Sequence, residues 1–233
     1  MSWQTPDFYA SEAEMFTENE FDRIHRNMWV TSEAQAIPIE RWDACLDPRL
    51  PPVGPSAPLV IGVDLSVSGD YTALVVVSPH PANHAIVAVR GVQVWKPPKG
   101  QKIDYTQGIM PALAWWCNNY NVVCVAYDEY QAHLMATELK KALGVWFKPF
   151  PQGKGTTINP GRPVGDKMFF DRVMARTIAH NGDETLRQHV MNAAAKSVDE
   201  RWIRFVKKAE GLKIDALVAA SMAVCTISRL NLG

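Results

Sequence analysis

Short apolar runs separated by polar turns begin at residue 59. Residues 59–64, 72–77 and 85–95 each have the length and the β-branched content of a strand. The turns between them, SVSGD and PHPANH, are short and polar, and Gly69 suits a hairpin. The three runs therefore predict an antiparallel three-strand meander.

After the meander, apolar runs alternate with helical spacing. The pattern predicts, in turn, a helix, a strand, a helix and a strand at residues 105–120, 121–127, 131–143 and 145–150. Further helices are expected at 166–180, 184–194 and 214–230, with one strand of a hairpin at 202–207. This order is typical of a ribonuclease H-like α/β fold, in which a mixed sheet combines the antiparallel meander with parallel strands and carries helices on both faces.

The first 58 residues have a different pattern. Residues 12–29 show helical spacing, and five prolines lie between Pro48 and Pro58, a composition typical of a stiff, extended linker. We therefore expect residues 1–58 to form a connector arm with a proline-rich linker, and residues 59–233 to form one α/β domain.

Charge supports this division. The chain has 24 acidic and 24 basic residues, and its zero net charge argues at first against a nucleic-acid partner. However, residues 1–58 carry 10 of the acids and only 4 of the bases, so the acidic arm precedes a body of net charge +6. A basic body is compatible with DNA binding.

Several functional classes are disfavoured by what the sequence lacks. The N-terminal segment has no apolar core of a signal peptide, and no apolar run approaches the roughly 20 residues of a membrane span, so we expect no membrane partner. The four cysteines form no CxxC pair, which favours a reducing cytoplasm over a disulfide framework. No phosphate-binding loop of the GxxxxGK[ST] type is present, so this chain is not a P-loop ATPase by itself.

Three aspartates occupy positions at which carboxylates could act together. Asp64 ends the first strand, Asp128 follows the fourth, and Asp215 begins the last helix. If the two strands are parallel neighbours, their ends meet at the sheet edge where α/β folds bind ligands. Each aspartate alone is also consistent with ordinary turn or helix-start chemistry. Together they predict ligands for two Mg²⁺ or Mn²⁺ ions, which could hydrolyse a phosphodiester, with Asp70 as an auxiliary or outer ligand.

Basic residues surround these aspartates in the sequence. We expect DNA contacts from side chains in the glycine-bearing loop and in the run before Asp215, namely Lys154, Arg162, Lys167, Lys207 and Lys208. A solvated basic surface is the alternative interpretation of the same residues.

The motifs VIGVDLSVSGDYTALVVV, VVCVAYDEYQAHLMATELKKALG and KIDALVAASMAV, in this order, resemble the nuclease domain of the large terminase subunit of tailed bacteriophages. FDRIHRNMWVTSEAQAIPIERWDAC resembles the connector before that nuclease, and HVMNAAAK also matches. The resemblance implies a metal-dependent endonuclease that cuts concatemeric double-stranded viral DNA in the cytoplasm of the bacterial host. It gives Asp64, Asp128 and Asp215 as the catalytic metal ligands and Asp70 as an auxiliary acid. It also implies a packaging ATPase domain, absent from this chain, with the portal protein and the small terminase subunit as candidate partners.

Three alternatives remain open at this point. A junction resolvase or transposase would share the fold and the aspartates. An actin-like phosphotransferase also has an Asp-ended strand and a glycine-bearing hairpin, although this chain is short for two such lobes. A non-catalytic module that docks DNA would use the basic residues without the aspartates.

Overall fold

The computed structural model describes residues 5–15, 35–66, 70–98, 100, 103–128, 139–199 and 201–230. Its centre is a six-stranded sheet with the strand order β5-β4-β1-β2-β3-β6. The strands are β1 (Leu59–Asp64), β2 (Thr72–His80), β3 (Asn83–Trp95), β4 (Val122–Asp128), β5 (Trp146–Phe150) and β6 (Ile178–Ala179).

The sheet is mixed, as the sequence predicts. β1, β2 and β3 pair antiparallel, whereas β4 and β5 continue the sheet parallel to β1, and β6 lies parallel to β3 at the far edge. The register of β1 and β4 aligns Val63 with Tyr127. The strand ends that carry Asp64 and Asp128 therefore lie side by side at one edge of the sheet.

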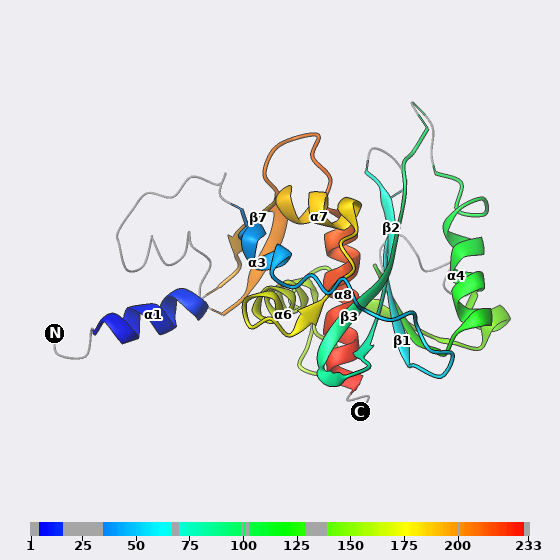
Figure 1. The fold of residues 1–233 in the computed structure, drawn as a ribbon. Helices are drawn as coiled ribbons and strands as arrows, with labels where there is room; N and C mark the ends of the chain where they lie inside the picture. The colour runs from blue at the N-terminus through cyan, green and yellow to red at the C-terminus, as the bar shows by residue number, and fades with distance from the viewer. Residues whose placement is uncertain are drawn as a thin grey trace.

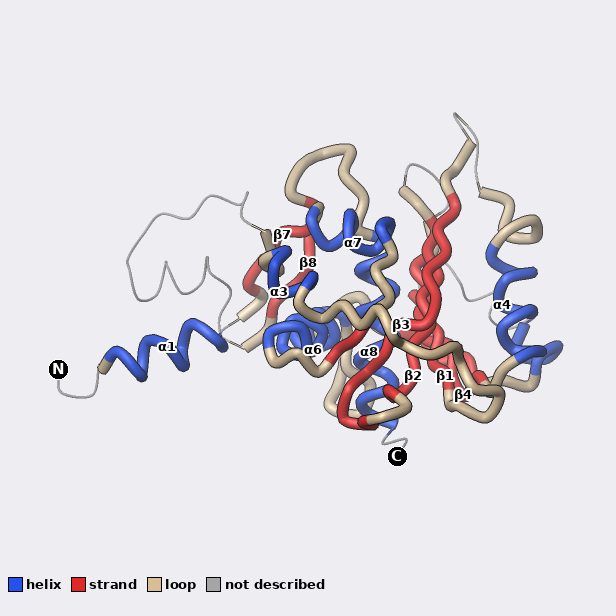
Figure 2. Tube along the Cα trace, viewed as in Figure 1, coloured by secondary structure: helices blue, strands red, loops and turns tan. Residues whose placement is uncertain are grey.

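Helices cover both faces of the sheet, which confirms the predicted fold class (Figure 1). One face packs against α8 (Asp215–Leu230). Helices α6 (Arg162–Met174) and α7 (Glu184–Met191) pack in turn against α8. The other face is covered by α4 (Ile109–Asn119), on the opposite side of the strands (Figure 2). Two apolar clusters result, one on each face of the sheet.

A separate hairpin stands next to α6. It consists of β7 (Ala193–Ser197) and β8 (Ile203–Lys207), which pair antiparallel. Phe205 of β8 is buried against Phe169 of α6. The hairpin therefore places the run before Asp215 against the helical layer.

Part of the N-terminal segment belongs to the core. Short helix α3 (Ile39–Asp43) buries Trp42, whose ring stacks on His180 with a centroid distance of 4.1 Å. Ala36 donates its backbone N–H to Ala193 O, and Asp43 pairs with Arg187. Helix α1 (Pro6–Met15) lies to one side of the fold (Figure 1).

The predicted elements differ from the observed ones at several boundaries. The helix expected at 166–180 starts earlier and ends at Met174, because Arg176 has a φ of +52° and the chain then pairs with β3 as β6. The helix expected at 184–194 ends at Met191, because the next residues join β8 instead. Gly69 and most of the residues expected to form helices at 12–29 and 131–143 lie outside the described residues.

No helix within the described ranges is both long and apolar enough to cross a membrane.

Candidate active site

The close contact between β1 and α8 fixes the geometry of the site. A Cβ at Gly62 would lie 1.9 Å from the backbone oxygen of Ala219, so only glycine allows the helix to pass this near the strand. From Gly62 to Asp64 the strand advances by ~6.6 Å, and from Ala219 back to Asp215 the helix covers ~6 Å. Asp64 and Asp215 therefore both lie just beyond the same contact.

The strand register adds the third aspartate. Gly62 is aligned with Ala126, so Asp64 and Asp128 are each two residues further along neighbouring parallel strands. Side chains two residues apart share a face of the sheet, and Ala126 belongs to the cluster on the α8 face. The three predicted aspartates are thus directed to the same side of the same sheet edge.

The first turn of α8 has an unusual cap. The ring nitrogen Nδ1 of His189, on α7, accepts the backbone N–H of Ala216 at 2.8 Å. His189 is buried, and burial lowers its pKa to about 4, so the ring is neutral and able to accept this bond. The contact holds the start of the helix, and therefore Asp215, in place.

The aspartates are electrostatically coupled. Burial raises the pKa of Asp64 well above its usual value, Arg162 opposes this rise, and the charges of Asp215, Asp128 and Asp70 add to it. Burial likewise raises the pKa of Asp215 to about 6. Burial and, second to it, neighbouring negative charge therefore both oppose ionisation of Asp64 and Asp215.

The residues present fit a divalent cation in their chemistry. Asp215 is 5% exposed, and its Oδ2 atom is buried without a hydrogen-bond partner. A buried carboxylate oxygen in this state is poorly solvated, and oxygen donors are the ligands that Mg²⁺ and Mn²⁺ prefer. In the part of the chain that the structure describes, no three His, Cys, Asp or Glu side chains are already grouped to hold one ion.

Asp70 is held by lysines. Its Oδ1 accepts hydrogen bonds from Lys207 Nζ and, at 2.7 Å, from Lys213 Nζ. Burial opposes ionisation, but these two hydrogen bonds outweigh it and the pKa of Asp70 is lowered. Asp70 is therefore an ionised carboxylate in a basic setting beside Asp215 and Asp64.

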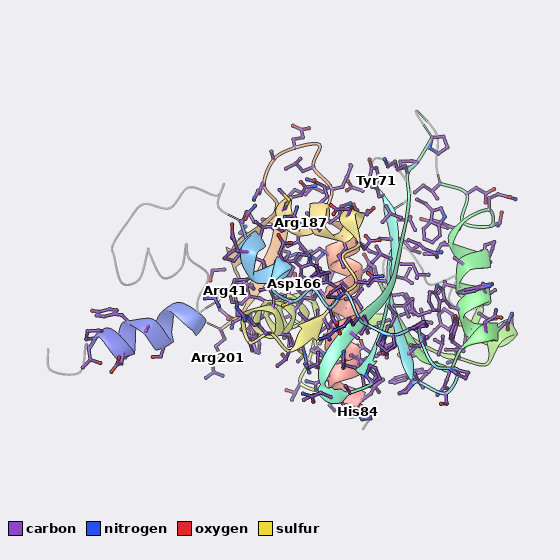
Figure 3. The ribbon with its side chains drawn as sticks, in the orientation of Figure 1. Arg41, Tyr71, His84, Asp166, Arg187 and Arg201 are labelled. Atoms are coloured by element: carbon purple, nitrogen blue, oxygen red, sulfur yellow. The ribbon has the colours of Figure 1, made fainter. Side chains whose placement is uncertain are left out.

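A second buried carboxylate, Asp166, was missed by the sequence analysis. It is fully buried, and its Oδ2 accepts from the Arg162 guanidinium at 3.1 Å and from the Phe205 backbone N–H at 3.0 Å. Its Oδ1 accepts from Ser221 Oγ at 2.6 Å. This network ties α6, β8 and α8 together in the interior (Figure 3). The spacing of Arg162 and Asp166, four residues apart, was the available signal.

The predicted DNA-contacting residues have different surroundings. The Arg162 side chain is only 8% exposed and also donates to Phe205 O, so it cannot present its guanidinium to DNA, and we correct that assignment. Lys154 is 64% exposed and pairs with Asp199. Lys167 pairs with Asp171 on the surface of α6, and Lys208 is half-buried after β8. Lys207 is the member of the set that reaches the aspartates, through Asp70.

Known proteins resemble this chain in sequence and in fold. The family described as the terminase large subunit, endonuclease domain, matches residues 6–90 and 93–229. Gene 13 protein of Mycobacterium phage D29 is 26% identical over 211 residues, which cover 79% of this chain and 33% of that protein. The chain thus spans about a third of the length of this curated relative.

Solved structures show the same fold. The large terminase of bacteriophage HK97 matches with a TM-score of 0.67 and 17% identity, over 94% of this chain and 49% of that one. The large terminase nuclease of thermophilic phage G20c matches with a TM-score of 0.59 and 14% identity, over 82% of this chain and 98% of that one. The G20c nuclease is also known with bound magnesium and with bound cobalt. At these identities the structures establish the fold, whereas the family match covers nearly the whole chain: this chain belongs to the terminase large subunit endonuclease domain family.

Proposed function

We propose that this chain is a divalent-metal-dependent endodeoxyribonuclease that cuts concatemeric double-stranded DNA during viral genome packaging. The observation that carries the proposal is the shared sheet edge at which Asp64 and Asp128 end neighbouring parallel strands, with Asp215 electrostatically coupled to Asp64 and carrying a buried, unpartnered oxygen. Family membership and the metal-bound G20c relatives support it.

Each aspartate has a role that follows from its position. Asp64 and Asp128 would hold metal from the strand ends, and Asp215 would close the site from the helix. Two bound Mg²⁺ or Mn²⁺ ions would activate a water molecule and stabilise the leaving oxygen of the phosphodiester. Asp70 would serve as an auxiliary ligand or orienting group, and Lys207 would face the negatively charged substrate.

DNA would approach along the basic surface around this edge. Lys207 and Lys208 lie at the end of β8, Lys154 lies in the loop before α6, and Lys167 lies on α6. Their charges would contact the phosphate backbone and would not read bases, which predicts cleavage with little sequence preference. Arg162 is left out of this surface because it is buried.

The biological setting of the proposal follows from the family. Partners would be a packaging ATPase domain, the portal protein and the small terminase subunit, in the cytoplasm of the bacterial host. We retain the division into a connector at 1–58 and a nuclease domain at 59–233 as part of the proposal. In that arrangement the connector would be anchored to the nuclease through α3, whose Trp42 is buried in the core.

Plasmid cleavage tests the proposal directly. The chain should nick or linearise plasmid DNA with Mn²⁺ or Mg²⁺ and not with a chelator. Asp64→Asn, Asp128→Asn and Asp215→Asn should each reduce the rate by at least about 100-fold, because a direct metal ligand matters more than its supporting residues.

Asp104→Asn is the matched control. Asp104 is an exposed aspartate before α4, and asparagine can preserve its bond to Thr106 N. This variant should cleave at the wild-type rate. Wild-type activity in Asp64→Asn and Asp128→Asn would rule out the proposed site. Preference for a four-way junction over linear duplex would instead indicate a resolvase.

A further inference from the structure

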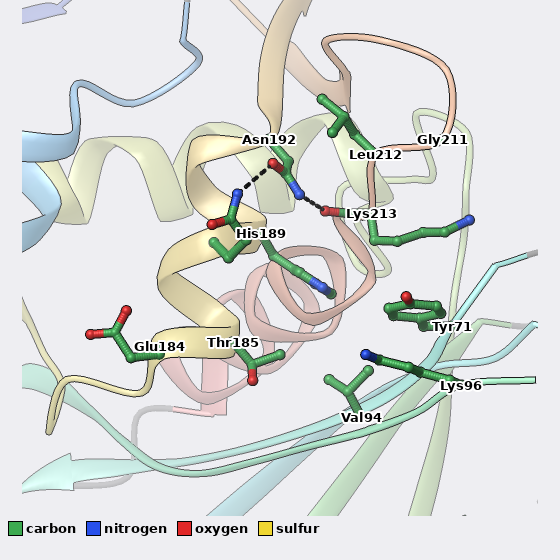
Figure 4. Close-up of a pocket in the computed structure, with 11 residues that line it drawn as sticks. Tyr71, Val94, Lys96, Glu184, Thr185, His189, Asn192, Gly211, Leu212 and Lys213 are labelled. Carbon is green, nitrogen blue, oxygen red and sulfur yellow. Dashed lines mark hydrogen bonds between the residues drawn. The ribbon is translucent and has the colours of Figure 1, made fainter.

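A pocket of about 480 Å³ lies between β3, α7 and the loop that leads into α8 (Figure 4). Its lining includes Tyr71, next to Asp70 in the sequence, and Lys213, which binds Asp70. The buried ring of His189, which caps the helix that begins at Asp215, also faces it. The pocket therefore borders the candidate active site without containing its three aspartates.

Two lysines approach the ring of Tyr71 in this pocket. Lys96 Nζ lies 5.5 Å from the ring centroid and Lys213 Nζ lies 5.4 Å from it. Figure 4 shows the two side chains above and below the ring. The attraction of a cation to an aromatic face favours this placement of both ammonium groups at the pocket wall.

The two lysines differ in their other partners. Lys213 is paired with Asp70. For Lys96, no acidic side chain among the described residues lies within ion-pair distance, and Tyr71 is its contact. Lys96 thus presents a positive charge that the protein itself leaves without a counterion in the described part of the chain.

The remaining lining carries several polar side chains. Gln188, Asn192 and Thr185 contribute amides and a hydroxyl, and Glu184 is the acid in the lining. Glu184 lies at the end of the pocket away from both lysines (Figure 4). The lysine end is therefore suited to an anion beside a flat ring, and a purely apolar ligand would leave these groups without partners.

We propose that this pocket is a DNA-backbone subsite, in which Lys96 and Lys213 bind a phosphate of the strand next to the scissile nucleotide and Tyr71 contacts its sugar or base. This inference rests on the proposed nuclease function. Lys213 lines this pocket and also pairs with Asp70 of the candidate active site, which favours a phosphate on the same strand as the scissile group over a free anion. Lysine contacts to phosphate and aromatic contacts to nucleotides are the usual combination at strand-binding surfaces.

Binding of a labelled duplex oligonucleotide to the full chain, in chelator and at several salt concentrations, tests the subsite without cleavage. Lys96→Gln should weaken binding several-fold, and the slope of log affinity against log salt should become less steep by about 0.9, the value for one lost phosphate contact. Tyr71→Ala should also weaken binding, and Tyr71→Phe should retain it because the ring remains. Lys141→Gln is the control, since Lys141 is an exposed lysine near the opposite strand ends.

Wild-type affinity and salt slope in Lys96→Gln would overturn the subsite, as would an equal loss in Lys141→Gln. Full competition by millimolar inorganic phosphate would overturn the assignment to a DNA strand. These experiments distinguish failure of the subsite from failure of the proposed nuclease function. A chain that cuts DNA but is indifferent to Lys96→Gln has the function without the subsite, and one that binds DNA through Lys96 but never cuts has the subsite without the function.

Discussion

Asp166 and Asp215 are both buried carboxylates at α8. Asp166 contacts the helix through Ser221, and Asp215 begins it, yet their surroundings are opposite. Asp166 receives hydrogen bonds on both oxygens and has the Arg162 guanidinium beside it. Asp215 has a buried oxygen without a partner, and burial raises its pKa to about 6. The protein thus provides partners for both oxygens of Asp166, which joins its elements, and leaves one oxygen of Asp215, at the start of α8, without a partner, where a cation could bind.

Asparagine at each position should separate the two roles most strongly. Asp166→Asn leaves the Arg162 guanidinium buried without a counterion, and we expect a loss of about 3–5 kcal/mol in the free energy of unfolding. Asp215→Asn replaces a buried carboxylate whose Oδ2 has no hydrogen-bond partner and whose charge is disfavoured by burial, so stability should stay equal or rise in metal-free buffer. Urea denaturation of both variants measures the difference.

The exposed ion pair of Asp43 and Arg187 provides the control for this experiment. It is bidentate, but Asp43 is 43% exposed, so Asp43→Asn should cost no more than about 1 kcal/mol. Equal losses in Asp43→Asn and Asp166→Asn would show that burial does not distinguish the two pairs. A large loss in Asp215→Asn would show that this carboxylate has a structural role.

A smaller effect is expected when only one partner of Asp166 is removed. Ser221→Ala deletes the hydroxyl that donates to Asp166 Oδ1 at 2.6 Å, and leaves Arg162 and Phe205 N in place. A hydrogen bond to a charged group contributes about 1.5–3 kcal/mol, so the loss should lie in that range and below that of Asp166→Asn. Thermal unfolding of the variant checks it. A loss equal to that of Asp166→Asn would mean that the network fails as one unit.

The three aspartates of the candidate site show what could be predicted from the sequence. The positions of Asp64 and Asp128 at the ends of neighbouring parallel strands, and of Asp215 at the start of the last helix, could be predicted because each adjoins a long apolar run. Their role as metal ligands stays a prediction. The tight approach at Gly62, which sets how near Asp215 comes, depends on how α8 packs and could not be read from the local pattern.

The sequence did not indicate the burial of Asp166, and it wrongly predicted that Arg162 contacts DNA, for the same physical reason. The local sequence places both in a basic, glycine-bearing stretch, which is typical of a solvated surface. Their burial depends on β8, whose backbone supplies both a donor and an acceptor from 39 or more residues away. The short strand β6 was likewise missed, because two residues carry no pattern and become a strand only through β3.

The last expected effect is a pH dependence that belongs to Asp215. Its pKa rises from an ordinary 3.8 to about 6 in the folded chain, so the folded state binds the proton more tightly than the unfolded state does. The stabilisation from that proton is complete below pH 3.8 and is lost as the pH rises through about 6. The free energy of unfolding of the wild type minus that of Asp215→Asn should therefore fall across this window and level off above it. Urea denaturation in chelator between pH 4 and 7 measures the difference, which also contains the change that losing the Asp215 charge causes in the titration of Asp64 and Asp70, since these carboxylates are coupled. A difference independent of pH would show that Asp215 is as well compensated as Asp166, and the contrast between the two carboxylates would then fail.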